Sequence, residues 1–168
     1  MSKKKCVFLT VSIIVLILAG FAPNVIAQEA PGIRFDGWGI RAGLSSDPDQ
    51  AYAGVHFDLG EFTKDVRFRP SMEVGFGDDR TLVQMLAEAH YVFPKFGTWR
   101  PYAGAGLGIT YVDYDDDRHR HGSKTEGSLN AIGGIETQLN QGMKLFFEFK
   151  LGLANQDPDI KFGIGLGW

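Results

Sequence analysis

The residues best suited to chemistry lie close together in one polar segment. Residues 118–123 read Arg-His-Arg-His-Gly-Ser, and Glu126 follows them. A histidine can activate a serine hydroxyl and a carboxylate can orient that histidine, so His121, Ser123 and Glu126 form a candidate hydrolytic set. His119 and His121 could instead bind a metal, but two histidines among arginines make a poor cation site. Such combinations arise easily by chance in a polar loop, so we expect neither an enzyme nor a metal centre.

A second set of candidates consists of charged residues that alternate with apolar ones. A buried charge without a partner would cost about 3 to 5 kcal/mol, so enclosed charges of opposite sign are expected to pair. Asp58 and Lys161 share the parity of this set. The predicted charge network comprises Arg41, Arg69, Glu73, Glu88, Glu136, Lys144, Glu148 and Lys150.

Strands must position these residues, because period-two alternation recurs along the chain and helical spacing does not. Turn-rich sequences separate eight alternating segments, an even number whose connections suit an antiparallel meander. No segment after the N-terminal region is apolar for long enough to form a membrane helix. The predicted strands are residues 37–45, 51–59, 66–77, 81–93, 100–114, 127–139, 143–154 and 160–168.

The two faces of these strands differ in their glycine content. Both a soluble barrel with an apolar pocket and a membrane barrel would show the same alternation. Glycine is concentrated on the charged face, where a water-exposed surface would have no use for missing side chains. A narrow lumen needs small neighbours beside long charged side chains, so the charged face is predicted to be the interior. These glycines are Gly39, Gly43, Gly75, Gly104, Gly106, Gly108, Gly134, Gly152, Gly163, Gly165 and Gly167.

The predicted fold is all-β, an eight-stranded antiparallel up-and-down transmembrane β-barrel. With an even strand number both chain ends lie at the same rim, the periplasmic one in such barrels. An aromatic girdle is expected at that rim, as at other membrane interfaces. Pro70 lies inside a predicted strand, where a local bulge is expected to accommodate it. The girdle residues are Trp38, Tyr91, Phe93, Trp99 and Trp168.

The first 27 residues have the features of a secretory signal peptide. Three lysines precede the apolar residues 7–22, and Val-Ile-Ala ends at position 27. We expect residues 28–36 to be a short periplasmic segment and residues 37–168 to be the barrel. The only cysteine, Cys6, would be removed, so disulfides are excluded. The mature chain would keep 14 basic and 20 acidic residues, and this negative charge argues against nucleic acid as a partner.

Four glycine-rich stretches carry a resemblance that covers essentially all of the mature chain. They resemble the small outer-membrane barrels of the opacity-protein and OmpA/OmpX type, often called the porin family. The resemblance implies a Gram-negative outer membrane, reached by Sec-type secretion and the barrel-assembly machinery. It also implies a monomer in contact with membrane lipids and lipopolysaccharide. The stretches are GWGIRAG (37–43), RPSMEVGFG (69–77), RPYAGAGLG (100–108) and FGIGLGW (162–168).

Ten of the 13 aspartates fall at the predicted outer mouth. Such carboxylates could hold Ca²⁺ or Mg²⁺ and bridge to lipopolysaccharide phosphates, but Asp-Pro-Asp and Gly-Asp-Asp are also ordinary turn sequences. The turn interpretation is favoured, and no cofactor is predicted. The ten are Asp47, Asp49, Asp78, Asp79, Asp113, Asp115, Asp116, Asp117, Asp157 and Asp159.

The expected function is non-enzymatic, with a structural or surface-interaction role in the cell envelope. A narrow, low-conductance pore is the first alternative, because the charged lumen could pass small ions instead of being plugged by ion pairs. A lipid A hydrolase is the second, because His121-Gly122-Ser123 is similar to the His-x-Ser pair of barrel-shaped lipid A deacylases. The asparagine and apolar residues that surround the pair in those enzymes are missing here. The resemblance identifies no extracellular ligand.

Overall fold

The computed structural model describes residues 32–77, 80–114, 123–139, 142–154 and 158–168. In these ranges the chain forms strands and turns, and no helix long and apolar enough to cross a membrane is found. The predicted signal peptide, residues 1–27, and the first residues of the predicted periplasmic segment, 28–31, lie outside the described residues.

Nine strands are present in the described part of the chain, and eight of them are long. They are β1 (Gly37–Ser46), β2 (Gln50–Asp58), β3 (Glu61–Thr63), β4 (Val66–Phe76), β5 (Arg80–Val92), β6 (Trp99–Tyr114), β7 (Ser123–Gln138), β8 (Lys144–Gly152) and β9 (Ile160–Gly167).

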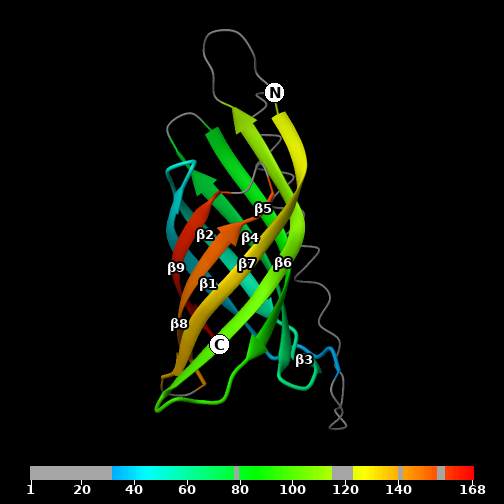
Figure 1. Cartoon of the computed structure of the whole chain (residues 1–168), viewed down its shortest axis with the longest axis vertical. Coiled ribbons are helices and arrows are strands. Elements are labelled where there is room, and N and C mark those ends of the chain that lie inside the picture. The colour runs from blue at the N-terminus through cyan, green and yellow to red at the C-terminus, as the bar shows by residue number, and fades with distance from the viewer. Residues whose placement is uncertain (1–31, 78–79, 115–122, 140–141, 155–157) are drawn as a thin grey trace. The chain divides into compact units, whose positions relative to one another are not determined.

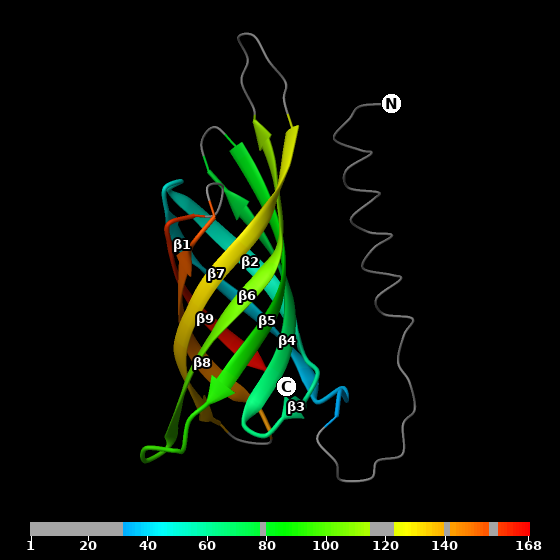
Figure 2. The ribbon, with the colours of Figure 1, turned by 45° about the vertical axis from the view of Figure 1, so that its right-hand side comes forward.

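The eight long strands close into an antiparallel barrel (Figure 1). Each long strand pairs with the next along the chain, β2 pairs with β4, and β9 pairs with β1. The short β3 is added only to the end of β4, outside the closed ring. Figure 2 shows the same tilted strands from a second side. Closure leaves no open edge around the ring, which is what a barrel surrounded by lipid requires. The predicted eight-stranded transmembrane fold is confirmed.

The two faces of the barrel are arranged as the alternation predicts. Arg41 and Glu88 point inward and are 2% and 0% exposed. The outward residues are apolar and exposed: Ile40 is 45%, Leu107 63% and Phe162 61% accessible. An apolar surface of this extent on every strand is suited to lipid and not to water.

The lumen also holds bulky aromatic residues that lie over glycines on neighbouring strands. A Cβ atom added at Gly134 would meet the Tyr102 ring, and one added at Gly165 would meet the Phe146 ring. Both rings are buried, with accessibilities of 3% and 1%. Inward glycines therefore provide the space that these rings occupy, in addition to the space for charged side chains.

Two strand boundaries differ from the sequence prediction. β7 begins at Ser123, four residues before the predicted start, and its pairing with β6 continues to the Asp113↔Ser123 pair. The added residues include Ser and Thr, which pair readily across strands. Residues 61–63, predicted to lie in a turn, form β3 and fold back on β4.

Pro70 lies within β4 without distorting its pairing to β5. The Phe68 amide points away from β5 and donates to the Gly60 carbonyl. Pro70 lies two residues further along the strand, so its ring nitrogen, which has no N–H, also faces away from β5. The β2–β4 ladder stops at the His56↔Ser71 pair, just before Pro70. The irregular pairing lies in the neighbouring strand β3, between Glu61 and Thr63, and the pairing of the Pro70 strand to β5 shows no bulge.

Adjacent glycines in β7 provide a direct test of lumen crowding. Gly134 lies under the Tyr102 ring, whereas a Cβ at Gly133 would meet nothing within 4 Å. We predict that Gly134→Val lowers the free energy of unfolding by about 1 to 3 kcal/mol because the ring and the Phe147 carbonyl on β8 must move. Gly133→Val is expected to change it by less than about 0.5 kcal/mol. Urea unfolding followed by tryptophan fluorescence measures both, and equal effects would contradict the steric argument.

Candidate functional site

Arg41 lies at the centre of the barrel lumen, surrounded by three carboxylates. Its Nη1 donates to Glu148 Oε1 at 2.7 Å and lies 3.2 Å from Glu73 Oε1 and 3.3 Å from Glu88 Oε1. The four side chains are at most 1% exposed. A guanidinium keeps its proton at any physiological pH, so it is a permanent counter-charge for these carboxylates.

Two lysines complete the charge balance around Arg41. Lys150 Nζ lies 2.6 Å from both Glu73 Oε1 and Glu88 Oε1. Lys161 Nζ lies 2.6 Å from Glu73 Oε2, and its side chain is 3% exposed. Three cations therefore face three carboxylates, and the group has no formal net charge. We call it the central network: Arg41, Glu73, Glu88, Glu148, Lys150 and Lys161.

The central network links strands from opposite sides of the ring. Its cations come from β1, β8 and β9, which are neighbours in the sheet. Glu73 and Glu88 come from β4 and β5, on the other side of the ring. Hydrogen bonds from Ser71 to Glu88 at 2.7 Å and from Tyr102 to Glu148 at 3.0 Å occupy further carboxylate oxygens. The bonded side chains consequently cross the lumen from wall to wall.

A second group of ion pairs lies toward the end of the barrel that carries the C-terminus. Arg67 binds both oxygens of Glu136, at 2.8 and 2.9 Å. Arg69 Nε donates to Asp58 at 2.6 Å. Lys144 lies 3.6 Å from Asp58 and is 33% exposed, at the edge of the group. We call these five residues the mouth cluster.

Aromatic rings separate the two groups of charges. The Arg41 guanidinium lies 5.8 Å from the centre of the Phe146 ring, and that of Arg69 lies 5.4 Å from it. Phe146 thus lies between a cation of each group, and Tyr102 lies 5.9 Å from Arg69. The His90 ring stacks on Tyr102 at 5.0 Å. Charged, aromatic and charged layers therefore follow one another along this part of the lumen.

A neutral polar layer adjoins the other side of the central network. Lys161 Nζ donates to Gln84 Oε1 at 2.7 Å, and Gln84 donates to Thr110 at 3.1 Å and to Ser128 at 2.7 Å. Asn130 donates to Ser128 at 3.0 Å. These buried amides and hydroxyls bond to one another across β5, β6 and β7.

All eight residues of the predicted charge network face the lumen, but they divide between two groups. Arg69, Glu136 and Lys144 belong to the mouth cluster, and the other five belong to the central network. The prediction omitted Arg67, although its position two residues before Arg69 gave it the same parity. Parity shows which side chains share a face, whereas the pairing partners depend on strand register.

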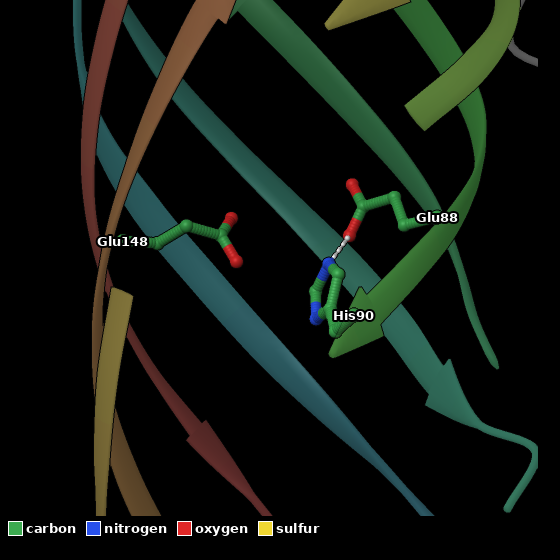
Figure 3. Close-up of side chains that lie close together, drawn as sticks. All are labelled: Glu88, His90 and Glu148. Atoms are coloured by element: carbon green, nitrogen blue, oxygen red, sulfur yellow. Dashed lines mark ion pairs between the residues drawn. The ribbon is translucent and has the colours of Figure 1, made fainter. Parts of the chain in front are cut away.

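Glu88, His90 and Glu148 lie together in the lumen (Figure 3), with one potential ligand atom of each within 4.8 Å of the others. His90 Nε2 lies 3.3 Å from Glu88 Oε2. Arg41 and Lys150 already bind the carboxylates of Glu88 and Glu148. A divalent ion would enter beside two permanent cations and displace their contacts, so this donor set does not fit a resident metal.

The candidate hydrolytic set is only partly described. His119, His121 and Gly122 lie outside the described residues, as do Asp78, Asp79, Asp115, Asp116, Asp117 and Asp157. Ser123 is exposed at the start of β7, and Glu126 forms an ion pair with Lys124. The carboxylate proposed to orient a histidine therefore already has a cationic partner.

The predicted girdle residues lie at the end of the barrel that carries the C-terminus. Trp38 and Trp168 stack with ring centres 5.2 Å apart. Tyr91 and Phe93 meet edge to face at 4.9 Å, and Trp99 lies 6.1 Å from Phe147. Aromatic side chains at this level are typical of the interface between lipid and water.

Removal of Arg41 should leave excess buried negative charge. We predict that Arg41→Met lowers the free energy of unfolding by about 3 to 5 kcal/mol. The double variant R41M/E148Q should recover a large part, because two carboxylates then face two lysines. Lys144→Met is the control and should cost less than about 1 kcal/mol because Lys144 is partly exposed. Urea unfolding measures all three, and equal losses for R41M and K144M would contradict the assigned role of Arg41.

Comparison with known proteins identifies the fold. No protein-family model matches the chain, and no curated protein shows significant sequence similarity to it. The crystal structure of Neisserial surface protein A (NspA) superimposes with a TM-score of 0.55 at 17% identity, over 78% of this chain and 92% of that one. The N-terminal β-barrel domain of Pseudomonas aeruginosa OprF gives 0.59 at 18% identity, over 79% and 96%. The described chain therefore shares the fold of the small eight-stranded outer-membrane β-barrels.

Proposed function

We propose that this chain is a non-enzymatic barrel of the Gram-negative outer membrane, with a structural or surface-interaction role in the envelope. The central network carries the proposal. Its six charged side chains are at most 3% exposed and connect opposite walls of the barrel. An ion passing through would have to break several charge-assisted hydrogen bonds, so the lumen acts as a plug and not as a path.

The outward surface supports the location. Apolar side chains cover the barrel, and aromatic residues mark one rim, which suits contact with membrane lipids and lipopolysaccharide. Strand β9 alternates and is followed by the aromatic Trp168, a pattern that suits a client of the barrel-assembly machinery. Sec-type secretion through the predicted signal peptide, and a monomeric state, complete the proposal.

The β6–β7 hairpin supports a surface-interaction role. These are the longest strands, and Figure 1 shows their ends extending beyond the other strands. Pairing of β7 with β8 ends at Asn130↔Gly152, and Leu153 donates to the Leu129 carbonyl. Backbone N–H and C=O groups of every second residue in a strand point to the same side. The peptide groups of Thr125 and Gly127 therefore point to the β8 side of β7, as that of Leu129 does, but they lie beyond the last paired residue of β8. Among the described residues no strand pairs with β7 on this side, and a strand edge in such a position can receive an extended segment of another protein.

We predict that the wild-type protein is silent in planar lipid bilayers. Glu73→Gln and Glu88→Gln each remove one carboxylate without opening the lumen and should also be silent. Glu61→Gln, on the exposed strand β3 outside the closed ring, is the matched control, and the triple variant R41S/F146A/E148S is a positive control for an emptied lumen. Discrete wild-type conductance steps that grow in E73Q or E88Q would replace the plug with the low-conductance pore.

Unchanged lipid A by mass spectrometry after overexpression is expected for a barrel that is not a lipid A hydrolase.

Single cysteines test the location and the orientation. The mature chain would contain no cysteine of its own, since Cys6 lies in the predicted signal peptide. We predict that Thr125→Cys reacts with a membrane-impermeant maleimide on intact cells, that Lys95→Cys reacts only after permeabilisation, and that Phe147→Cys, on the lipid face, reacts in neither case. Reaction of all three on folded protein in detergent-free buffer would contradict a membrane location.

A further inference from the structure

A cavity of about 280 Å³ lies at the barrel end that carries the aromatic girdle. The β3–β4 hairpin contributes Glu61 and Asp65, and the end of β5 with the following turn contributes Tyr91, Phe93 and Lys95. Arg100, near the start of β6, completes the polar lining. The Val92 amide donates to the Asp65 carbonyl at 2.8 Å, so the hairpin is joined to the end of β5. The cavity is therefore formed by segments attached to the rigid barrel.

The charged side chains that line this cavity are not joined by ion pairs. Glu61, Asp65, Lys95 and Arg100 form no ion pair with any described residue, in contrast to the paired charges inside the lumen. Two carboxylates from the β3–β4 hairpin and two cations from residues 95–100 thus remain open to a ligand. A ligand of one sign would be attracted by one half of the lining and repelled by the other. A zwitterion that carries a phosphate and an ammonium group would find a counter-charge for each.

Two aromatic residues connect the cavity to the lipid-facing surface. Tyr91 and Phe93 are 45% and 43% exposed and pack edge to face, and both line the cavity. Such residues lie at the level where acyl chains give way to headgroups. A lipid beside them would place its chains along the apolar wall and its headgroup in the charged cavity.

We infer that this cavity binds the headgroup of a phospholipid with a primary ammonium, of the phosphatidylethanolamine class, in the leaflet at the end of the barrel that carries the C-terminus. Lys95 and Arg100 bind the phosphate, and Glu61 and Asp65 accept hydrogen bonds from the ammonium. The inference rests on the proposed membrane location and is independent of whether the lumen conducts.

Native mass spectrometry of the full-length mature protein, released from mixed nanodiscs, tests this site. With equal amounts of phosphatidylethanolamine and phosphatidylglycerol, wild type should retain one phosphatidylethanolamine with at least about a tenfold preference. Only phosphatidylethanolamine carries the ammonium that Glu61 and Asp65 bind. E61Q/D65N should therefore abolish the preference for this lipid. K95A/R100A should weaken retention of both lipids. K124A/E126Q, at the other end of the barrel, is the matched control and should behave as wild type.

The remaining arms separate the sources of the headgroup chemistry. Excess glycerophosphoethanolamine or inorganic phosphate should not displace the lipid, because neither has chains to lie along Tyr91 and Phe93. Displacement of the lipid by an excess of either soluble compound would overturn the lipid assignment in favour of a soluble ligand. Equal retention of both lipids by wild type would also overturn it. Heat-modifiable gel mobility confirms that each variant is folded, and conductance measured on the same samples tests the plug separately.

Discussion

Six charged side chains that neutralise one another inside a space closed to water hold the walls of this barrel together. Each carboxylate of the central network has at least two polar contacts, and each cation has at least two carboxylate or amide partners. Removal of a single member would leave a charge that water cannot reach. Strands distant in the ring therefore depend on one another, in addition to the backbone pairing that links neighbours.

The glycine content follows from the same constraint. An eight-stranded ring leaves little room, and the network, the rings of Tyr102 and Phe146 and the mouth cluster must all fit within it. Because Gly134 and Gly165 have no side chains, they leave that room on the inner face. Outside the ring no such limit applies, and large apolar residues face the lipid. The sequence pattern and the packing thus both place the charged, glycine-rich face inside the barrel and the apolar face outside.

Alternation and glycine placement in the sequence were sufficient to predict the barrel, its strand number and the inward face. They were not sufficient to pair the charges. Arg69 and Glu73 share a face and a strand, yet they belong to different groups, because the strand register places Arg69 near Asp58 and Glu73 near Lys150. The inward position of Phe146 was also missed, since an apolar residue among charged ones on the inner face runs against the pattern. Local turn chemistry predicted a loop at residues 61–63, where pairing with β4 instead forms β3.

A sealed interior moves any interaction to the two rims, and the rims differ. At one, the β6–β7 hairpin extends past its neighbours and presents peptide groups near Thr125 and Gly127. At the other, Glu61, Asp65, Lys95 and Arg100 surround a cavity without pairing. Charges that could have paired in the narrow lumen did so, whereas those at this rim remain available beside lipid-facing rings. The contrast indicates that a ligand carrying both signs, more than an internal partner, completes the electrostatics of this end.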